Sequence, residues 1–306
     1  MHRARLVIGG LLAFFILASC STGREQAPTV TVIPLADATV AILTFSRQVD
    51  GMTMVYIPAG EFKMGSDDGS IDEQPVHAVY LDGFWIDETE VTNSMFGKFV
   101  TATGYETDAQ RAGSSMTWNG ATGRDMPGAD WQHPYGPGTD LIGAEDHPAV
   151  HISWNDASTY CEWAGARLPS EAEWEKAAGG GLEGADYPWG DEAPTCDMDS
   201  DNGAHYYDCN VEGTIPVGSF EPNGYGLYDM AGNVWEWVED WYGVDYYSQS
   251  PGENPHGPAS GDYRSLRGGS WGTSVSNLRV TNRNWLFPDL TIIYFGFRCA
   301  DSEFPR

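Results

Sequence analysis

The sequence predicts a single large α+β domain with little regular secondary structure. Short runs of β-forming residues come first, and three helix-like segments with capping signals follow them. Glycine occurs 37 times and tryptophan 12 times in 306 residues, which is typical of a loop-rich globular protein. We find no solenoid repeat and no Gly/Ser-rich linker after residue 50, so one domain of about 250 residues is favoured over two.

The first 20 residues indicate an exported, lipid-anchored protein. Two arginines precede an apolar stretch at residues 7–17, which is too short to span a bilayer comfortably. This stretch ends in Leu17-Ala18-Ser19-Cys20, which resembles the lipobox of bacterial lipoproteins, where a peptidase cuts before a cysteine that becomes lipidated. The alternative is an uncleaved anchor with a chance cysteine. We expect residues 1–19 to be a signal peptide and Cys20 to hold the protein outside the cytoplasm, on the cell membrane or outer membrane.

Residues 20–49 are expected to form a lipidated tether, with room for a short packed strand near residues 30–33 or 40–43. The formal charge of −28 would become −30 after loss of the two early arginines. Such a charge excludes a nucleic-acid binder, which needs a basic surface, and leaves the lipid anchor as the expected membrane contact. The hydrophobic fraction of 41% excludes a disordered acidic tail.

Three β-rich runs open the domain. They lie at residues 54–58, 76–81 and 84–86, and an Asp82-Gly83 turn separates the last two. The pattern then changes to helix. Thr92 or Asn93 is expected to cap a helix that runs to about Thr103.

Two further helices are expected, followed by turns and short aromatic strands. One covers about residues 155–164. The other begins after Ser170, whose side chain forms a capping box with Glu173, and a run of three glycines from Gly179 ends it.

Several sequence blocks, in a fixed order over residues 50–303, resemble the formylglycine-generating enzyme (sulfatase-modifying factor) family. The resemblance implies an irregular, elaborated C-type-lectin-like fold with bound calcium. The blocks are Glu88-Thr89-Glu90-Val91-Thr92-Asn93, Arg167-Leu168-Pro169-Ser170-Glu171-Ala172-Glu173-Trp174-Glu175, Gly226-Leu227-Tyr228-Asp229-Met230, Gly232-Asn233-Val234-Trp235-Glu236-Trp237, Leu266-Arg267-Gly268-Gly269-Ser270-Trp271 and Gly296-Phe297-Arg298-Cys299.

Family oxidases install formylglycine in sulfatases and bind copper through two cysteines after the Gly-Gly-Ser-Trp block. Paired thiolates select copper(I) because both partners are soft. Here the two positions are Thr273 and Leu278, so copper is not expected and the resemblance implies the fold but not the oxidase activity. A family branch acts in pyoverdine maturation without these cysteines, so an enzymatic role stays open as an alternative.

Four cysteines remain after Cys20, and their number alone allows three pairings. The resemblance implies a structural disulfide between Cys161 and Cys299. Cys196 and Cys209 bracket one loop and are expected to pair as well. The alternative is free buried thiols.

The resemblance also implies a calcium site across the Asp229–Glu236 block. Its ligands would be the side chains of Asp229 and Glu236 and the carbonyls of Gly232 and Val234. Calcium prefers about six to eight hard oxygen ligands, backbone carbonyls included. The alternative for Glu236 is a buried carboxylate that caps backbone amides.

A second calcium candidate is the acidic loop that contains Asp197, Asp199, Asp201 and Asp208. The alternating aspartates resemble an EF-hand loop, and Asp208 stands twelfth from Asp197. However, the glycine comes one place late and no helices flank the loop. The alternative is a solvated acidic loop.

The tail between Trp271 and Gly296 departs from the usual family pattern, which is rich in asparagine and arginine. It resembles the variable proteins of diversity-generating retroelements, in which mutated adenines turn AAC codons into NNC codons. The substituted positions would lie on a ligand-binding face, where aromatic and aliphatic anchors supply binding energy. The alternative is a buried strand near residues 290–297, because the run lacks period-two polarity. The expected ligand-binding residues are Thr273, Ser274, Ser276, Trp285, Leu286, Phe287, Leu290, Ile292, Ile293 and Tyr294.

The leading hypothesis is a non-catalytic, lipid-anchored module that binds a protein or glycan ligand through this tail. One alternative is an enzyme, either a formylglycine-type oxidase or a cysteine-free maturation enzyme. Another is a structural subunit of an envelope complex. Calcium is the expected cofactor.

Overall fold

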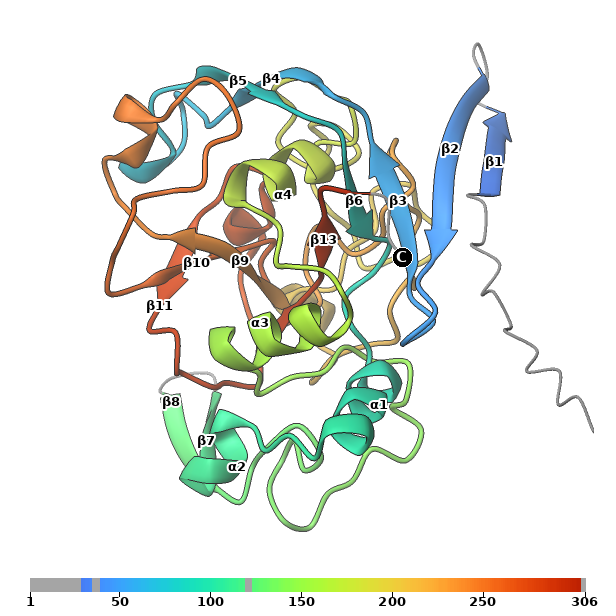
Figure 1. Cartoon of the computed structure of the whole chain (residues 1–306), viewed down its shortest axis with the longest axis vertical. Coiled ribbons are helices and arrows are strands. Elements are labelled where there is room, and N and C mark those ends of the chain that lie inside the picture. The colour runs from blue at the N-terminus through green and yellow to red at the C-terminus, as the bar shows by residue number, and fades with distance from the viewer. Residues whose placement is uncertain (1–28, 35–38, 119–122, 304–306) are drawn as a thin grey trace, which may run out of the picture.

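A five-stranded sheet combines four strands from the first third of the chain with the last strand of the chain (Figure 1). The computed structural model describes residues 29–34, 39–118 and 123–303. Consecutive strands of this sheet pair in antiparallel fashion, and the predicted strands at 54–58 and 84–86 are confirmed as β3 and β6. In sheet order the strands are β1 (Thr29–Pro34), β2 (Thr39–Ser46), β3 (Thr53–Ile57), β6 (Phe84–Asp87) and β13 (Ala300–Asp301).

A second, four-stranded sheet is built from the C-terminal third of the chain. Strand β9 is central, with β12 parallel to it on one side and β10 antiparallel on the other, while β11 ends the sheet beside β10. Two hairpins complete the strands, and one of them contains the predicted strand at 76–81. The bounds are β9 (Trp235–Trp241), β10 (Arg264–Arg267), β11 (Asn284–Leu286), β12 (Phe295–Phe297), β4 (Gly60–Met64) with β5 (His77–Leu81), and β7 (Ser114–Trp118) with β8 (Gly123–Pro127).

The three predicted helices are confirmed, and their capping residues define their ends. Thr92 caps the first helix by accepting from the Met95 amide, and Gly104 ends it with a φ of 69°. Ser170 and Glu173 form the predicted capping box. One short helix was not predicted. The helices are α1 (Asn93–Thr103), α2 (Asp108–Ala112), α3 (Trp154–Trp163) and α4 (Glu171–Ala178), with single 3₁₀ turns η1 (Ile71–Glu73), η2 (Tyr207–Cys209), η3 (Tyr246–Gln249) and η4 (Val275–Leu278).

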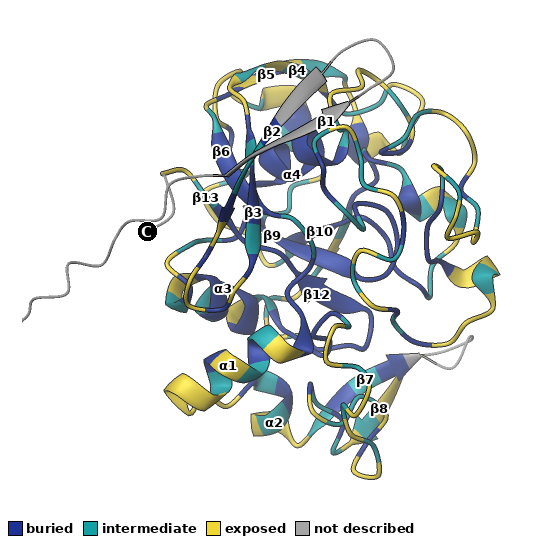
Figure 2. Cartoon of the chain, turned by 90° about the vertical axis from the view of Figure 1, so that its right-hand side faces the viewer, coloured by how far each residue is buried: buried dark blue, intermediate teal, exposed yellow. Residues whose placement is uncertain are grey.

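The hydrophobic core lies between the two sheets and the helices. Aromatic residues of α1 and α3 pack against β12, where Phe96, Tyr160 and Phe297 form mutual ring contacts. Helix α4 packs with the five-stranded sheet in a second cluster that includes Trp174. Figure 2 shows the central strands buried and the outer faces of α1 and α2 exposed. The start of β9 and the chain around β11 are both held against this core, and each contributes residues to a candidate site described below.

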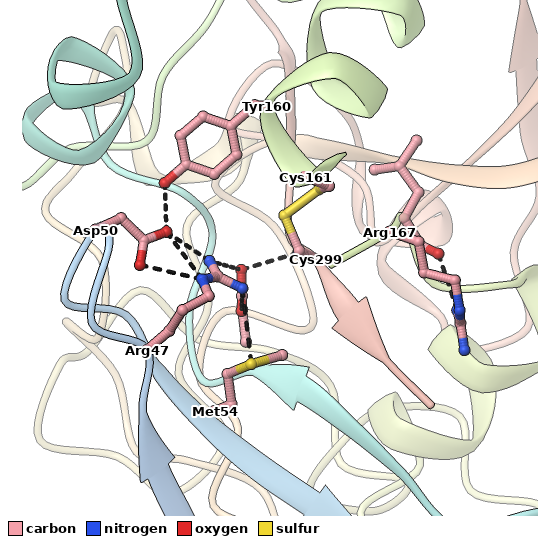
Figure 3. The surroundings of a disulfide bond; sticks show 9 residues. Arg47, Asp50, Met54, Tyr160, Cys161, Arg167 and Cys299 are labelled. Carbon is pink, nitrogen blue, oxygen red and sulfur yellow. Dashed lines mark hydrogen bonds and ion pairs between the residues drawn. A yellow bond between two sulfur atoms is a disulfide. The ribbon is translucent and has the colours of Figure 1, made fainter. Parts of the chain in front are cut away.

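Part of the expected tether belongs to the folded domain. Strand β2 pairs with β3, so the packed strand allowed for near residues 40–43 is present. Arg47 follows this strand and is buried, with ion pairs to Asp50 and Asp87 at 2.6 and 3.0 Å (Figure 3). Residues 42–50 are therefore part of the packing, whereas the expected signal peptide and Cys20 lie outside the described residues.

Both expected disulfides are present. Cys161 in α3 bonds Cys299 beside β13, which ties a helix to the last strand of the sheet (Figure 3). Cys196 bonds Cys209 across the acidic loop. Over the described stretches, no helix has the length and apolar character needed to cross a membrane.

Candidate functional site

Glu236 is held by a guanidinium at the start of β9. The carboxylate accepts hydrogen bonds from Arg298 Nε and Nη2, both at 2.7 Å, and from Trp174 Nε1 at 2.8 Å. All three side chains are buried. Glu236 is therefore buried, and the guanidinium of Arg298 already balances its negative charge.

Asp229 and Glu90 lie close enough to this pair to be affected by the charge of Arg298, and neither acid forms an ion pair of its own among the described residues. Asp229 has a φ of 57° and accepts from the Gly218 amide at 2.6 Å. Glu90 is fully buried, and within the described residues neither of its carboxylate oxygens has a hydrogen-bond partner. Burial, and then the charges of Asp229 and Glu236, raise the pKa of Glu90 well above its ordinary value. Burial likewise raises the pKa of Asp229.

A buried carboxylate without a partner is costly while charged, so Glu90 needs either the proton that its raised pKa favours or a cation to neutralise it. Oxygen donors from Glu90 and Asp229 are the kind that calcium prefers. Asp229 and Asp201 also line one small cavity of about 20 Å³, roughly the space of one water molecule. No group of three His, Cys, Asp or Glu is placed to hold a metal in the described chain. Of the expected ligands Asp229, Gly232, Val234 and Glu236, the structure shows Glu236 bound by Arg298. Sequence reasoning missed Glu90, whose oxygens have no hydrogen-bond partner among the described residues.

The acidic loop has the geometry of a solvated turn. Asp197, Asp199, Asp201 and Asp208 are all exposed. The Asp197 carboxylate accepts from the Asp199 amide at 3.1 Å, so it supports the local turn. These aspartates do not gather around a common point, which fits the alternative stated for them above.

Thr273 and Leu278, the positions at which the resemblance led us to expect copper-binding cysteines, lie in a packed turn. Thr273 Oγ1 accepts from the Ser270 amide at 2.9 Å and donates to the Ser270 carbonyl at 3.0 Å. Leu278 is fully buried in a cluster with Tyr187 and Tyr206. Ser274 and Ser276 are exposed and share a hydrogen bond at 3.0 Å. Neither Thr273 nor Leu278 offers a sulfur ligand.

The structure divides the tail into a buried part and an exposed part. Ile292, Ile293 and Tyr294 are buried in the main core cluster, so they are not available as surface anchors. Leu286 and Leu290 are partly buried against the same cluster. For these residues the buried alternative holds, because the chain from 290 onward leads into β12 beneath the helices.

Trp285 and Phe287 are the exposed aromatic residues of the tail, with exposed fractions of 40% and 49%. Trp285 packs against Tyr242 and Tyr263 with ring centroids 5.5 and 4.4 Å apart, and Tyr263 packs against Phe287 at 4.6 Å. We call these four residues the aromatic platform. Sequence reasoning found Trp285 and Phe287 but missed the two tyrosines, which follow β9 and precede β10.

The chain matches known proteins over nearly its whole length. A sulfatase-modifying factor enzyme 1-like domain matches residues 41–303. The formylglycine-generating enzyme of Streptomyces coelicolor is 44% identical over 278 residues, covering 81% of this chain and 88% of that protein. The inactive C-alpha-formylglycine-generating enzyme 2 of Mus musculus is 38% identical over 285 residues, covering 81% and 85%.

Solved structures support the same assignment. PvdO from Pseudomonas aeruginosa superposes with a TM-score of 0.67 at 30% identity, covering 84% of this chain and 97% of that one. Variable protein 1 of Treponema denticola superposes with a TM-score of 0.63 at 25% identity, covering 90% and 100%. The fold is thus the C-type-lectin-like fold expected from the sequence, and the chain belongs to the sulfatase-modifying factor enzyme 1-like domain family.

Proposed function

We propose that this chain is a non-catalytic binding module that recognises a protein or glycan ligand through its C-terminal tail. The observation that carries the proposal is the aromatic platform, where Trp285 and Phe287 remain exposed although neighbouring apolar residues of the tail are buried. Exposed, contiguous aromatic surface is characteristic of interaction sites. The likeness to the Treponema variable protein supports the same reading.

The chemistry at Thr273 and Leu278 supports a non-catalytic role. A threonine that closes a turn and a leucine in a packed cluster supply no thiolate for copper. The mouse relative whose name describes it as inactive is an example of a family member without the enzymatic activity. An oxidase or maturation enzyme remains the second candidate, because identity to the Streptomyces enzyme reaches 44%.

Two assays on the full-length chain separate these functions. In the first, the chain is incubated with copper and a cysteine-containing sulfatase-motif peptide, and we expect no formylglycine by mass spectrometry. In the second, displayed peptides and arrayed glycans are selected against the wild type and against Trp285→Ala/Phe287→Ala. We expect selected ligands to lose binding to this variant but not to Tyr80→Ala, since Tyr80 is equally exposed, at 40%, on the β4–β5 hairpin. Copper-dependent conversion of the peptide would contradict the proposal.

We also propose that the domain binds calcium through the side chains of Glu90 and Asp229. A bound cation would satisfy the carboxylate of Glu90 and offset the mutual repulsion of the two acids. We expect chelation to lower the melting temperature of the wild type, since a ligand at 100 times its Kd contributes about 2.7 kcal/mol. Glu90→Gln should abolish this response and, in chelator, melt at or above the wild type, because one buried charge is removed. Asp199→Asn should respond like the wild type, and an unchanged wild-type melting temperature in chelator would count against the site.

Lipid anchoring through Cys20 and retroelement diversification of the tail are two further proposals. The lipobox-like motif motivates the first, and metabolic labelling with a fatty acid should mark the wild type but not Cys20→Ala. The second is motivated by Trp285 and Phe287, which depart from the usual family pattern and are exposed. A downstream near-copy of the tail with adenines at these codons, beside a reverse transcriptase gene, is the expected observation. Its absence would remove the idea.

A further inference from the structure

The aromatic platform presents a continuous row of four rings at the edge of the second sheet. Trp285 lies on β11, the strand that ends this sheet, and Phe287 follows two positions later. Tyr263 touches both of them, and Tyr242 stacks on Trp285 with an interplanar angle of 28°. Mutual packing fixes the rings in place, so a ligand meets a preorganised surface.

Two exposed aspartates are sequence neighbours of residues in this row. Asp262 immediately precedes Tyr263, and Asp289 comes two residues after Phe287. Both aspartates are exposed, and neither takes part in an ion pair in the part of the chain that the structure describes. Electron-rich ring faces and two exposed negative charges are thus neighbours along the chain.

The inner end of the row already accommodates a guanidinium. The Arg283 guanidinium lies 4.8 Å from the centre of the Tyr242 ring. On the neighbouring strand, the Arg264 guanidinium lies between Trp154 and Trp241 at 3.7 and 3.6 Å. These contacts provide internal examples of the cation–π packing that the rings of this sheet support.

We infer that the aromatic platform binds a basic peptide segment of a partner protein, with an arginine or lysine side chain on the rings and its charge facing Asp262 and Asp289. This inference rests on the proposed binding function and names the chemistry of the ligand. A neutral sugar would use the rings but gain nothing from the carboxylates. An acidic glycan would be repelled by them and by the net charge of −28.

The test uses a pair of fluorescent hexapeptides, one with two arginines and one with citrulline, which is uncharged and nearly isosteric, at the same positions. Binding to the full-length chain is followed by anisotropy at low and high salt. We expect the arginine peptide to bind at least tenfold more tightly than the citrulline peptide, with the difference reduced by salt because the charges are exposed. Trp285→Ala and Asp262→Asn/Asp289→Asn should each weaken arginine-peptide binding about tenfold.

Matched controls separate local from general effects. Tyr80→Ala removes an equally exposed ring, and Glu106→Gln/Asp125→Asn removes two exposed charges from other elements. Neither should change binding. Equal binding of both peptides, loss of binding in the charge control, or no binding at millimolar peptide would overturn the inference. If neutral peptides or glycans bind and depend on Trp285, the proposed function stands and only the basic ligand is refuted. If ligands bind independently of Trp285, both fail.

Discussion

Replacing Arg47 by methionine should destabilise the domain strongly, because Arg47 is the cation between two buried carboxylates. Its guanidinium donates to Asp50 at 2.6 to 3.1 Å and to Asp87 at 3.0 and 3.3 Å. The Tyr160 hydroxyl donates to Asp50 as well, at 2.7 Å. These side chains surround the disulfide of Cys161, so the network joins the N-terminal segment to α3 and the sheet (Figure 3).

The magnitude follows from burial. Arg47 is 2% exposed, and breaking a buried ion pair by removing one partner costs about 3–5 kcal/mol because the other charge is left uncompensated. Methionine fills much of the space left by the aliphatic stem, so the loss reports mainly on charge. The exposed pair of Lys63 and Glu183 is the matched control, with exposures of 61% and 64%. Lys63→Met should leave stability close to that of the wild type, because exposed ion pairs contribute little.

The loss should also depend on pH. Burial raises the pKa of Asp87 to about 6 even beside Arg47, whereas hydrogen bonding and the charge of Arg47 oppose burial and lower the pKa of Asp50. Without Arg47, burial dominates at both acids and raises both folded pKa values above the unfolded value of about 3.9. An acid with a raised folded pKa destabilises the fold progressively as pH rises above about 4. The deficit of Arg47→Met should therefore be smaller at pH 5 than at pH 8, by at least about 1 kcal/mol.

Urea unfolding with the disulfides intact, at pH 5 and pH 8, measures the stability deficit of the variant and its change with pH. Wild type, Arg47→Met and Lys63→Met are compared under each condition. A deficit below about 1 kcal/mol at pH 8 would refute the reasoning, since it lies well under the roughly 3–5 kcal/mol expected when a buried ion pair loses one partner. A deficit of equal size at both pH values would refute the account of the two acids.

The remaining predictions concern the disulfides, a buried histidine and a helix cap. Replacing the cysteines of Cys161–Cys299 by alanine should cost about 5 kcal/mol and those of Cys196–Cys209 about 3 kcal/mol, because the closed loops span 138 and 13 residues; equal losses in denaturant titrations would contradict the entropy model. Burial lowers the pKa of His151 to about 4, so its contribution is present above about pH 6.5 and lost as pH falls through 4. His151→Asn, which tolerates the φ of 58°, should flatten the pH dependence of stability over that interval, and an unchanged slope would assign it to other groups. Ser170→Ala should lower stability by about 1 kcal/mol through loss of the α4 cap, and a calorimetric melting curve that matches the wild type would count against that hydrogen bond.

Local signals were sufficient where a few neighbouring residues decide the structure. The cap of α1 at Thr92 and the capping box of Ser170 and Glu173 were predictable, because each satisfies amides within three residues. Runs of β-forming residues and adjoining turn residues likewise indicated β3 and β6. The extent of the domain was harder to predict, since β2 and Arg47 follow a Ser/Thr/Pro/Ala-rich stretch and gain their structure from β3 and Asp87.

The candidate site depends on contacts between residues that are distant in the sequence. The sequence shows Glu90 within a family block. That Glu90 has no partner among the described residues follows from a distant contact: Arg298, over 200 residues later, is paired with Glu236. The aromatic platform joins Tyr242 and Tyr263 to a tail that begins beyond them. No pattern within either segment indicates that they meet, because strand order, not sequence proximity, brings β9, β10 and β11 together.

The sequence by itself determined the family, the elements with local caps and turns, the cysteine inventory, and the absence of thiolates at Thr273 and Leu278. Only the tertiary structure decided which apolar residues of the tail are buried. Ile292 to Tyr294 and the pair Trp285 and Phe287 are all aliphatic or aromatic side chains, and this shared character does not tell which of them are buried. Their exposure depends on what covers them: the main core packs over the first group, whereas β11 ends its sheet and leaves the second group at the surface.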